Sequence, residues 1–321
     1  MASPNLSEIT TTTMRFRSGK LRDNVSKNIA LLMRLNEKGN VAPVSGGESI
    51  IEELEYAENS TFMYYSGDEV LNVGSSDVFT SATYNWKQCA AAVKINGLEL
   101  LQNSGKEKVI DLLEARIKNA EKTMLNNMST GCYSDGTGTG GKQIGGLQLL
   151  VSDAGTGTVG GIDSSTYTFW QNTVYDFSTN GVAASALTIQ DAMNSLYLST
   201  ARNRDVVDLI VADNTYFGYY WKSLQAIQRI TDDKMASAGF QTLKFMGADV
   251  VYDGGFQGTA PSAHMYFLNT DYIKLRPHRD RNMVPLNPDR FSTNQDAMVK
   301  LFGWAGNMTI SNRALQGVMV A

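Results

Sequence analysis

The feature that most constrains this chain is an acidic segment that also has the composition of β-strands. Residues 46–86 contain eight Asp or Glu residues and no Lys or Arg. Within this segment, 54–65 and 70–84 are rich in β-branched and aromatic residues and are separated by Ser66-Gly67-Asp68, a pattern that predicts a long hairpin. Because a two-stranded hairpin cannot bury its own faces in water, we expect it to lie against a neighbour.

A basic segment precedes the acidic one, with seven bases and two acids in residues 15–38. The two segments could pair within one chain, or the hairpin could meet bases on a neighbouring chain, either in this segment or in a basic patch at 274–281. The residues that we expect at such a contact between subunits are Glu52, Glu53, Glu55, Glu58, Arg15, Arg17, Lys20, Arg22, Lys274, Arg276, Arg279 and Arg281.

Composition excludes several classes of protein. The net charge of the 321 residues is -4, so nucleic acid is not predicted as a dominant partner. A hydrophobic fraction of 42% excludes disorder for most of the chain. Two cysteines cannot form a disulfide framework, and no apolar run is long enough to span a membrane.

The rest of the chain predicts an α+β protein. Apolar residues at helical spacing predict a long helix over 106–129, and a glycine-rich segment, with a strand-like stretch at 144–151, follows it. Two further helices are expected at 188–202, with Thr188 as its cap, and at 213–230, capped by Asp213. The predicted strands are 206–212, 243–246, 248–252, 265–268, 272–275, 298–304 and 315–320.

No set of residues predicts a reaction. The glycine-rich segment contains two G-x-G-x-x-G matches and a near match to a phosphate-binding loop at Gly136, Gly141 and Lys142. Such loops follow a strand and precede a helix, whereas here a helix comes first and a strand-like stretch follows. The two histidines, His264 and His278, have no nucleophile beside them in sequence. We therefore expect no catalytic residue, cofactor or metal.

The order of elements and several short motifs resemble the tailed-bacteriophage major capsid proteins with the Hong Kong 97 fold. That order is a basic arm, an acidic hairpin, a long helix, a glycine-rich stretch and then mixed helices and strands. The similar motifs are Gly145-Gly146-Leu147, Phe169-Trp170-Gln171-Asn172, Met246-Gly247-Ala248-Asp249-Val250-Val251, Met265-Tyr266-Phe267-Leu268-Asn269, Lys300-Leu301-Phe302-Gly303-Trp304-Ala305-Gly306-Asn307 and Asn312-Arg313.

The resemblance implies a division of the chain and a function. Residues 1–46 would be an N-terminal arm, 47–95 the E-loop hairpin, 96–185 a P domain with the spine helix at 106–129, 186–277 an A domain, and 278–321 a return to the P domain. The chain would be a non-enzymatic coat protein of the virion, assembled in the host bacterial cytoplasm. Pentamers and hexamers of it would form an icosahedral head around double-stranded DNA.

The resemblance also implies partners and leaves alternatives open. The short arm lacks a fused scaffolding domain, so a separate scaffolding protein is expected, together with a portal, packaged DNA bound without sequence specificity, and optionally a decoration protein. Some relatives cross-link through a hairpin lysine, but this hairpin has no lysine before Lys87, so we expect no covalent cross-links. The alternatives are an encapsulin-type nanocompartment shell, which shares the fold, and a nucleotide-binding enzyme that uses the glycine-rich loop.

Overall fold

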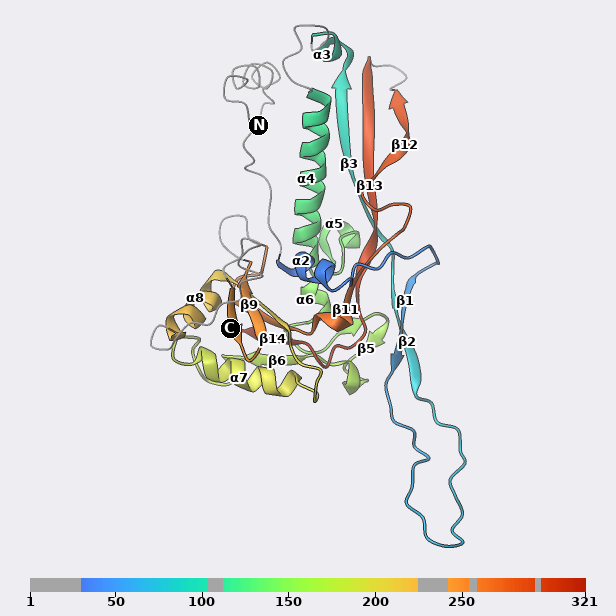
Figure 1. The fold of residues 1–321 in the computed structure, drawn as a ribbon, viewed down its shortest axis with the longest axis vertical. Coiled ribbons are helices and arrows are strands. Elements are labelled where there is room, and N and C mark those ends of the chain that lie inside the picture. The colour runs from blue at the N-terminus through green and yellow to red at the C-terminus, as the bar shows by residue number, and fades with distance from the viewer. Residues whose placement is uncertain (1–29, 103–111, 225–241, 254–258, 292–295) are drawn as a thin grey trace.

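The computed structural model describes residues 30–102, 112–224, 242–253, 259–291 and 296–321. These residues form a long helix lying along an antiparallel sheet, a second sheet that carries two helices, and a hairpin that projects away from both (Figure 1). The predicted α+β class is therefore confirmed.

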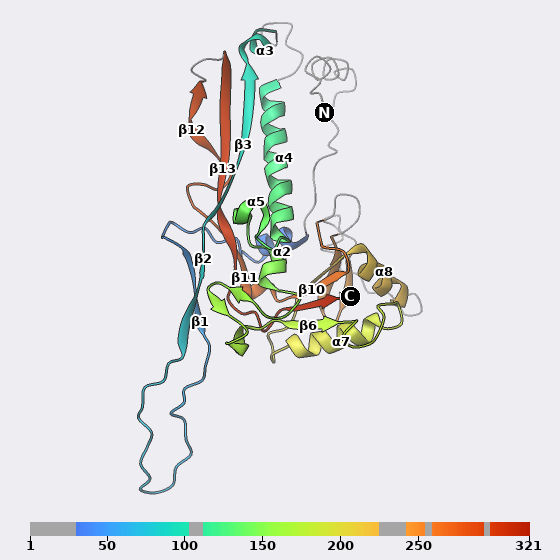
Figure 2. The ribbon, with the colours of Figure 1, turned by 180° about the vertical axis from the view of Figure 1, so that it is seen from behind.

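The first sheet is organised around β13 (Ala297–Ile310). β3 (Lys87–Asn96) pairs antiparallel with one edge of β13, and β12 (Val284–Phe291) and β11 (Ile273–Pro277) pair antiparallel with successive parts of the other edge. The helix α4 (Leu112–Cys132) lies along β3 and β13, as the two ribbon views show (Figures 1 and 2). The single long strand β13 thus holds the other three strands of this sheet together.

The α4 side chains that face this sheet follow the helical spacing of the sequence. Ala120, Met124 and Met128 are buried in one core with Val93 and Phe302 of the sheet. The start of the helix predicted over 106–129 lies outside the described residues. Its end comes three residues later than predicted, because the buried residue 132 continues the core contact and outweighs the modest cost of a glycine in the last turn.

Neither β3 nor β12 was predicted from the sequence. In β3, the run Ala90-Ala91-Ala92 has low strand propensity, and only Val93 and Ile95 of the strand are buried. Pairing with β13 along its whole length forms the strand. Residues 87–95, assigned to the hairpin from the sequence, therefore pair within this sheet.

The second sheet has six described strands, and helices cover one of its faces. Its order is β6 (Thr173–Asp176), β14 (Gly317–Val320), β10 (His264–Leu268), β7 (Leu209–Ala212), β9 (Ala248–Tyr252) and β8 (Thr242–Phe245). Ile210, Val250 and Phe267 point to the side covered by α7 (Ile189–Thr200) and α8 (Asn214–Ser223), and their sequence neighbours belong to the core on the other side. Burial on both faces explains the nearly continuous apolar runs of these strands.

The C-terminal strand β14 lies between β6 and β10 in this second sheet. β12 and β13, by contrast, belong to the first sheet, along which α4 lies (Figure 1). The last segment of the chain therefore contributes strands to both sheets.

The two predicted helix caps differ. The Asp213 carboxylate accepts a hydrogen bond from Tyr216 N at 2.9 Å and caps α8 as expected. Thr188 makes no cap bond to α7, because its hydroxyl donates to the Ala183 carbonyl at 2.9 Å and stabilises the preceding turn instead.

The glycine-rich segment does not have the order of a phosphate-binding loop. After α4 come α5 (Gly138–Gly141), in which Thr139 and Gly140 have positive φ and interrupt the helical turn, and α6 (Leu147–Leu150), a single turn of helix. The strand predicted at 144–151 is therefore wrong: Leu147 and Leu150 are completely buried on one face of a helical turn. Other short elements are α2 (Ala30–Glu37), α3 (Gly97–Gln102), η3 (Thr168–Trp170), η5 (Thr270–Tyr272) and the hairpin of β4 (Thr158–Val159) and β5 (Ile162–Asp163).

Candidate functional site

The projecting hairpin is the most distinctive surface of the structure. β1 (Ile50–Glu55) and β2 (Phe79–Tyr84) pair antiparallel over six residues at its base. Residues 57–77 form no strand and run outward as a long loop (Figures 1 and 2). The strands predicted over 54–65 and 70–84 are thus mostly wrong. Aromatic and β-branched residues favour strands whose faces are covered. In the part of the chain that the structure describes, nothing covers the faces of a longer ribbon, and an uncovered two-stranded ribbon is only marginally stable.

The outer part of the hairpin is apolar as well as acidic. We call its seven exposed large apolar side chains the apolar tip: Phe62, Met63, Tyr64, Tyr65, Val70, Leu71 and Val73. Tyr64 is 90% exposed, and Val70 and Val73 are each 91% exposed. A concentration of exposed apolar side chains of this kind marks a surface that another molecule covers.

The base of the hairpin is held by a buried ion cluster, which we call the hairpin anchor. Glu52 on β1 is 5% exposed. Its Oε1 accepts hydrogen bonds from Arg276 Nε at 2.7 Å and from Thr309 Oγ1 at 2.9 Å, and its Oε2 lies 3.7 Å from Lys274 Nζ. These contacts connect β1 to β11 and β13.

The electrostatics of the anchor favour the ionised carboxylate. Burial acts to raise the pKa of Glu52, but the hydrogen bond and charge of Arg276, with Thr309 and Lys274, outweigh it. The pKa of Glu52 is therefore below its ordinary value. Glu52 carries its charge in the folded protein and is satisfied without any partner subunit.

Further contacts fix the hairpin base from both sides. The Tyr84 hydroxyl donates to the Ile310 carbonyl at 2.9 Å, and Thr83 N donates to the Gly160 carbonyl at 2.8 Å. Gly160 has a φ of +60°, and a Cβ on it would lie 2.8 Å from the Ala82 Cβ. Both the left-handed backbone and the lack of space favour glycine at this turn between β4 and β5.

The four hairpin acids predicted to meet a neighbour do not form one group. Glu52 pairs with Lys274 and Arg276 of its own chain, which corrects the expectation that these three residues meet across subunits. The alternation of a strand explains the difference, because residue 52 points inward while its neighbours point to solvent. Glu53, Glu55 and Glu58 are exposed and stay predicted contact residues.

The predicted basic partners also divide into groups. Arg15, Arg17, Lys20 and Arg22 lie outside the described residues. Arg279 and Arg281 are exposed, and Arg281 donates a 3.3 Å hydrogen bond to Gln88. The patch at 274–281 therefore has two bases in the anchor and two on the surface.

Two other bases of the segment 15–38 pair within the chain. They belong to α2 (Ala30–Glu37) and the turn after it. Arg34 Nε lies 3.0 Å from the Asp208 carboxylate, and Lys38 Nζ lies 2.7 Å from that of Asp271. This network, which sequence inspection missed, ties α2 to the six-stranded sheet.

Arg313 is a second feature that sequence inspection did not reveal. Its side chain is completely buried and donates to the carbonyls of Leu150 at 2.7 Å and Trp170 at 2.9 Å, and to Asn172 Oδ1 at 2.8 Å. Burial lowers the pKa of Arg313 to about 10. The guanidinium thus joins residues 150–172 to the C-terminal segment, and its only sequence signal is the motif Asn312-Arg313.

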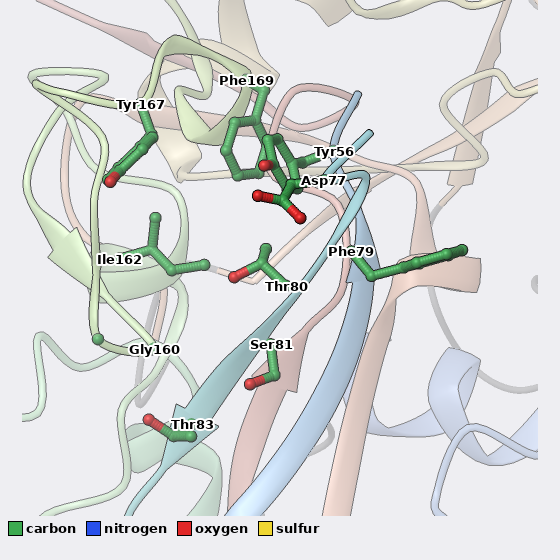
Figure 3. Close-up of a pocket in the computed structure, with 11 residues that line it drawn as sticks. Tyr56, Asp77, Phe79, Thr80, Ser81, Thr83, Gly160, Ile162, Tyr167 and Phe169 are labelled. Carbon is green, nitrogen blue, oxygen red and sulfur yellow. The ribbon is translucent and has the colours of Figure 1, made fainter. Parts of the chain in front are cut away.

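A cavity of about 430 Å³ lies between the hairpin base and the loop that carries β4 and β5 (Figure 3). Three of its four aromatic lining residues lie close together: the Tyr56 and Phe169 centroids are 5.4 Å apart, and those of Tyr167 and Phe169 are 6.3 Å apart. The Asp77 carboxylate projects into the space beside them (Figure 3). The other lining residues are Phe79, Thr80, Ser81, Thr83, Gly160, Gly161 and Ile162.

The residues considered for catalysis have structural partners. His264 Nε2 lies 3.0 Å from the Asp153 carboxylate, and its Nδ1 lies 2.7 Å from the Ser262 carbonyl. His278 accepts a hydrogen bond from Asp280 N at 3.1 Å. In the described ranges, no group of three or more His, Cys, Asp and Glu side chains could hold a metal. The helices described here also include none that is long and apolar enough to cross a membrane.

Comparison with solved structures identifies the fold. The cyanophage A-1(L) capsid asymmetric unit matches 94% of this chain and 96% of its own, with a TM-score of 0.68 and 14% identity. The capsid of the native GTA particle matches 94% of this chain and 91% of its own, with a TM-score of 0.61 and 13% identity. The predicted Hong Kong 97-type capsid fold is therefore confirmed.

A shell of another kind has the same fold. The holo-SrpI encapsulin complex from Synechococcus elongatus matches 100% of this chain and 96% of its own, with a TM-score of 0.58 and 8% identity. No protein-family model matches the sequence, and no curated protein does. The likeness is one of fold, carried by the arrangement of elements and not by sequence.

Proposed function

We propose that this chain is the major capsid protein of a tailed bacteriophage, a subunit that closes an icosahedral head around double-stranded DNA. The observation that most supports this proposal is the projecting hairpin, which is anchored at its base by the Glu52–Arg276 contact and is uncovered at its apolar tip. On a fold shared with capsid subunits, such an arm supplies a contact with the next copy. The role is structural and not enzymatic.

The shape of the subunit favours assembly by contacts between unlike surfaces. The apolar tip and the acids Glu53, Glu55 and Glu58 lie on the hairpin, whereas the exposed bases Arg279 and Arg281 lie after β11. Contact between different patches produces rings or lattices, and not closed dimers. Pentamers and hexamers are the expected rings.

The division into an N-terminal arm (1–46), E-loop (47–95), P domain (96–185 and 278–321) and A domain (186–277) belongs to this proposal. So do the partners: a separate scaffolding protein, a portal, an optional decoration protein, and DNA held without sequence specificity. The protein would be found in the virion after assembly in the host cytoplasm.

Electron microscopy of the expressed chain tests the proposed function directly. Shells or capsomers should be visible in negative stain, and native mass measurement should find pentamers or hexamers. A monomer that persists at high concentration, at both low and high salt, would contradict the proposal.

The contents of the particles separate the phage capsid from the encapsulin alternative, which the fold supports as well. A phage head protein from infected cells should co-purify with DNA, whereas an encapsulin should co-purify with a protein cargo. The acidic hairpin and the basic N-terminal segment favour the phage capsid.

A further inference from the structure

The cavity at the hairpin base has the charge of a cation site. Its lining contains the Asp77 carboxylate and no Lys or Arg. Among the described residues, no hydrogen bond or ion pair involves that carboxylate. A cation entering the cavity would therefore meet an unpaired negative charge.

The rings of the lining favour a cation of a particular kind. Tyr56, Tyr167 and Phe169 form a continuous aromatic group on one side of Asp77 (Figure 3). Aromatic faces attract Lys and, more often, Arg side chains, and a carboxylate can accept two hydrogen bonds from one guanidinium. The Thr80 and Ser81 side chains supply further acceptors at the same opening. An arginine side chain fits this combination best.

The chain itself contains a suitable donor of such a side chain. Residues 15–22 contain four bases, Arg15, Arg17, Lys20 and Arg22, and no acid. The surface patch is a poorer donor, because Asp280 separates its two exposed bases, and its other two bases belong to the hairpin anchor. Charge complementarity therefore favours the N-terminal segment over the patch.

We propose that the cavity lined by Tyr56, Asp77, Tyr167 and Phe169 binds an arginine from residues 15–22 of a second copy of this chain, an inference that rests on the proposed function. The bound side chain would place its guanidinium against Asp77 and its stem against the rings. Since the cavity also touches Gly160 and Thr83, the contact would join one subunit's arm to the fixed base of another's hairpin.

Photo-cross-linking in assembled particles tests this contact. Tyr167, which is 53% exposed, is replaced by p-benzoylphenylalanine in unlabelled chain, and this chain is assembled with an equal amount of ¹⁵N-labelled wild-type chain. After irradiation, mass spectrometry should find the peptide around residue 167 linked to labelled peptides that contain residues 15–22. The label shows that the link joins two copies.

A matched pair of variants tests the role of charge. Asp77→Asn should lower the yield of this cross-link about fivefold, as expected for a partly exposed cation contact. Asp68→Asn, at the distal turn of the same hairpin, should leave the yield unchanged. Equal yields in the two variants would overturn the assignment of Asp77.

The other outcomes are also decisive. Links only within one chain, links to residues 274–281, or particles that give no link would overturn this proposal while leaving the proposed function intact. Failure of the wild-type chain to form particles would contradict the proposed function, and this proposal would then be wrong as well.

Discussion

Replacement of Glu52 by Gln should loosen the hairpin base without unfolding the rest of the subunit. The change keeps the shape of the side chain but leaves Arg276 and Lys274 without their counter-charge. Breaking a fully buried pair costs about 3–5 kcal/mol. The Arg276 and Lys274 side chains retain 20% and 32% exposure, so solvent compensates part of the loss. We therefore expect a cost of about 2 kcal/mol.

Hydrogen–deuterium exchange measures this cost where it arises. A loss of about 2 kcal/mol in local opening should speed amide exchange in β1 and β2 about thirtyfold. Exchange in the six-stranded sheet should not change. Glu53→Gln is the matched control, because residue 53 is the next residue along the same strand and is exposed. If both variants exchange at the same rate as wild type, the anchor does not hold the hairpin.

The pH dependence of the anchor has a definite sign. The folded pKa of Glu52 lies below its ordinary value, so the stability that its charge supplies is present above about pH 4.3, near the unfolded pKa. It is lost as the pH falls through the lower, folded pKa. After correction for intrinsic exchange rates, protection of β1 and β2 should be constant from neutral pH to about pH 5. Below about pH 4 it should fall, and Glu52→Gln should remove this step.

Three further predictions concern other parts of the molecule. Arg313→Met should lower the free energy of unfolding by about 3 kcal/mol, because it leaves several buried acceptors unpaired. The control Arg204→Met, at an exposed residue, should change this free energy by less than about 0.5 kcal/mol. Equal denaturant midpoints for the two variants would contradict this prediction. Replacing Tyr64 and Val73 of the apolar tip together by Ser should prevent particle formation, as seen by electron microscopy, and should leave the thermal midpoint of the subunit unchanged. Normal particles would show that the tip is not a contact surface. On a denaturing gel, mature particles boiled in detergent and reductant should give one band at the monomer mass of 35.1 kDa. The reason is that the hairpin before Lys87 has no lysine amine that could form an isopeptide bond. A ladder of bands would refute this prediction.

Local sequence patterns predicted the elements whose side chains repeat with a clear period. The spacing of Ala120, Met124 and Met128 predicted the spine helix, and apolar runs predicted most strands of the six-stranded sheet, since both are buried along regular faces. Asp213 was recognised as a cap because capping depends on one side chain and the next three residues.

Elements formed by distant partners were missed or misplaced. β3 is a strand because β13, some two hundred residues later in the chain, pairs with it, and no local propensity in Ala90-Ala91-Ala92 indicates this. The outer hairpin has the composition of strands, yet a ladder ends where the chain itself offers no more covering surface. In both cases the deciding contact is tertiary.

The sequence by itself determined that residues 46–86 are acidic and contain no Lys or Arg, because composition and charge are properties of the residues alone. It also determined, through the order of its elements, the fold now matched to capsid structures. Only the tertiary structure decided which acidic side chains of the hairpin are buried in ion pairs and which are exposed to solvent. Glu52 and Glu53 are indistinguishable in the sequence, but one is buried against Arg276 and the other faces solvent. Burial and pairing depend on what the fold brings across from β11 and β13, and a one-dimensional charge pattern does not contain that information.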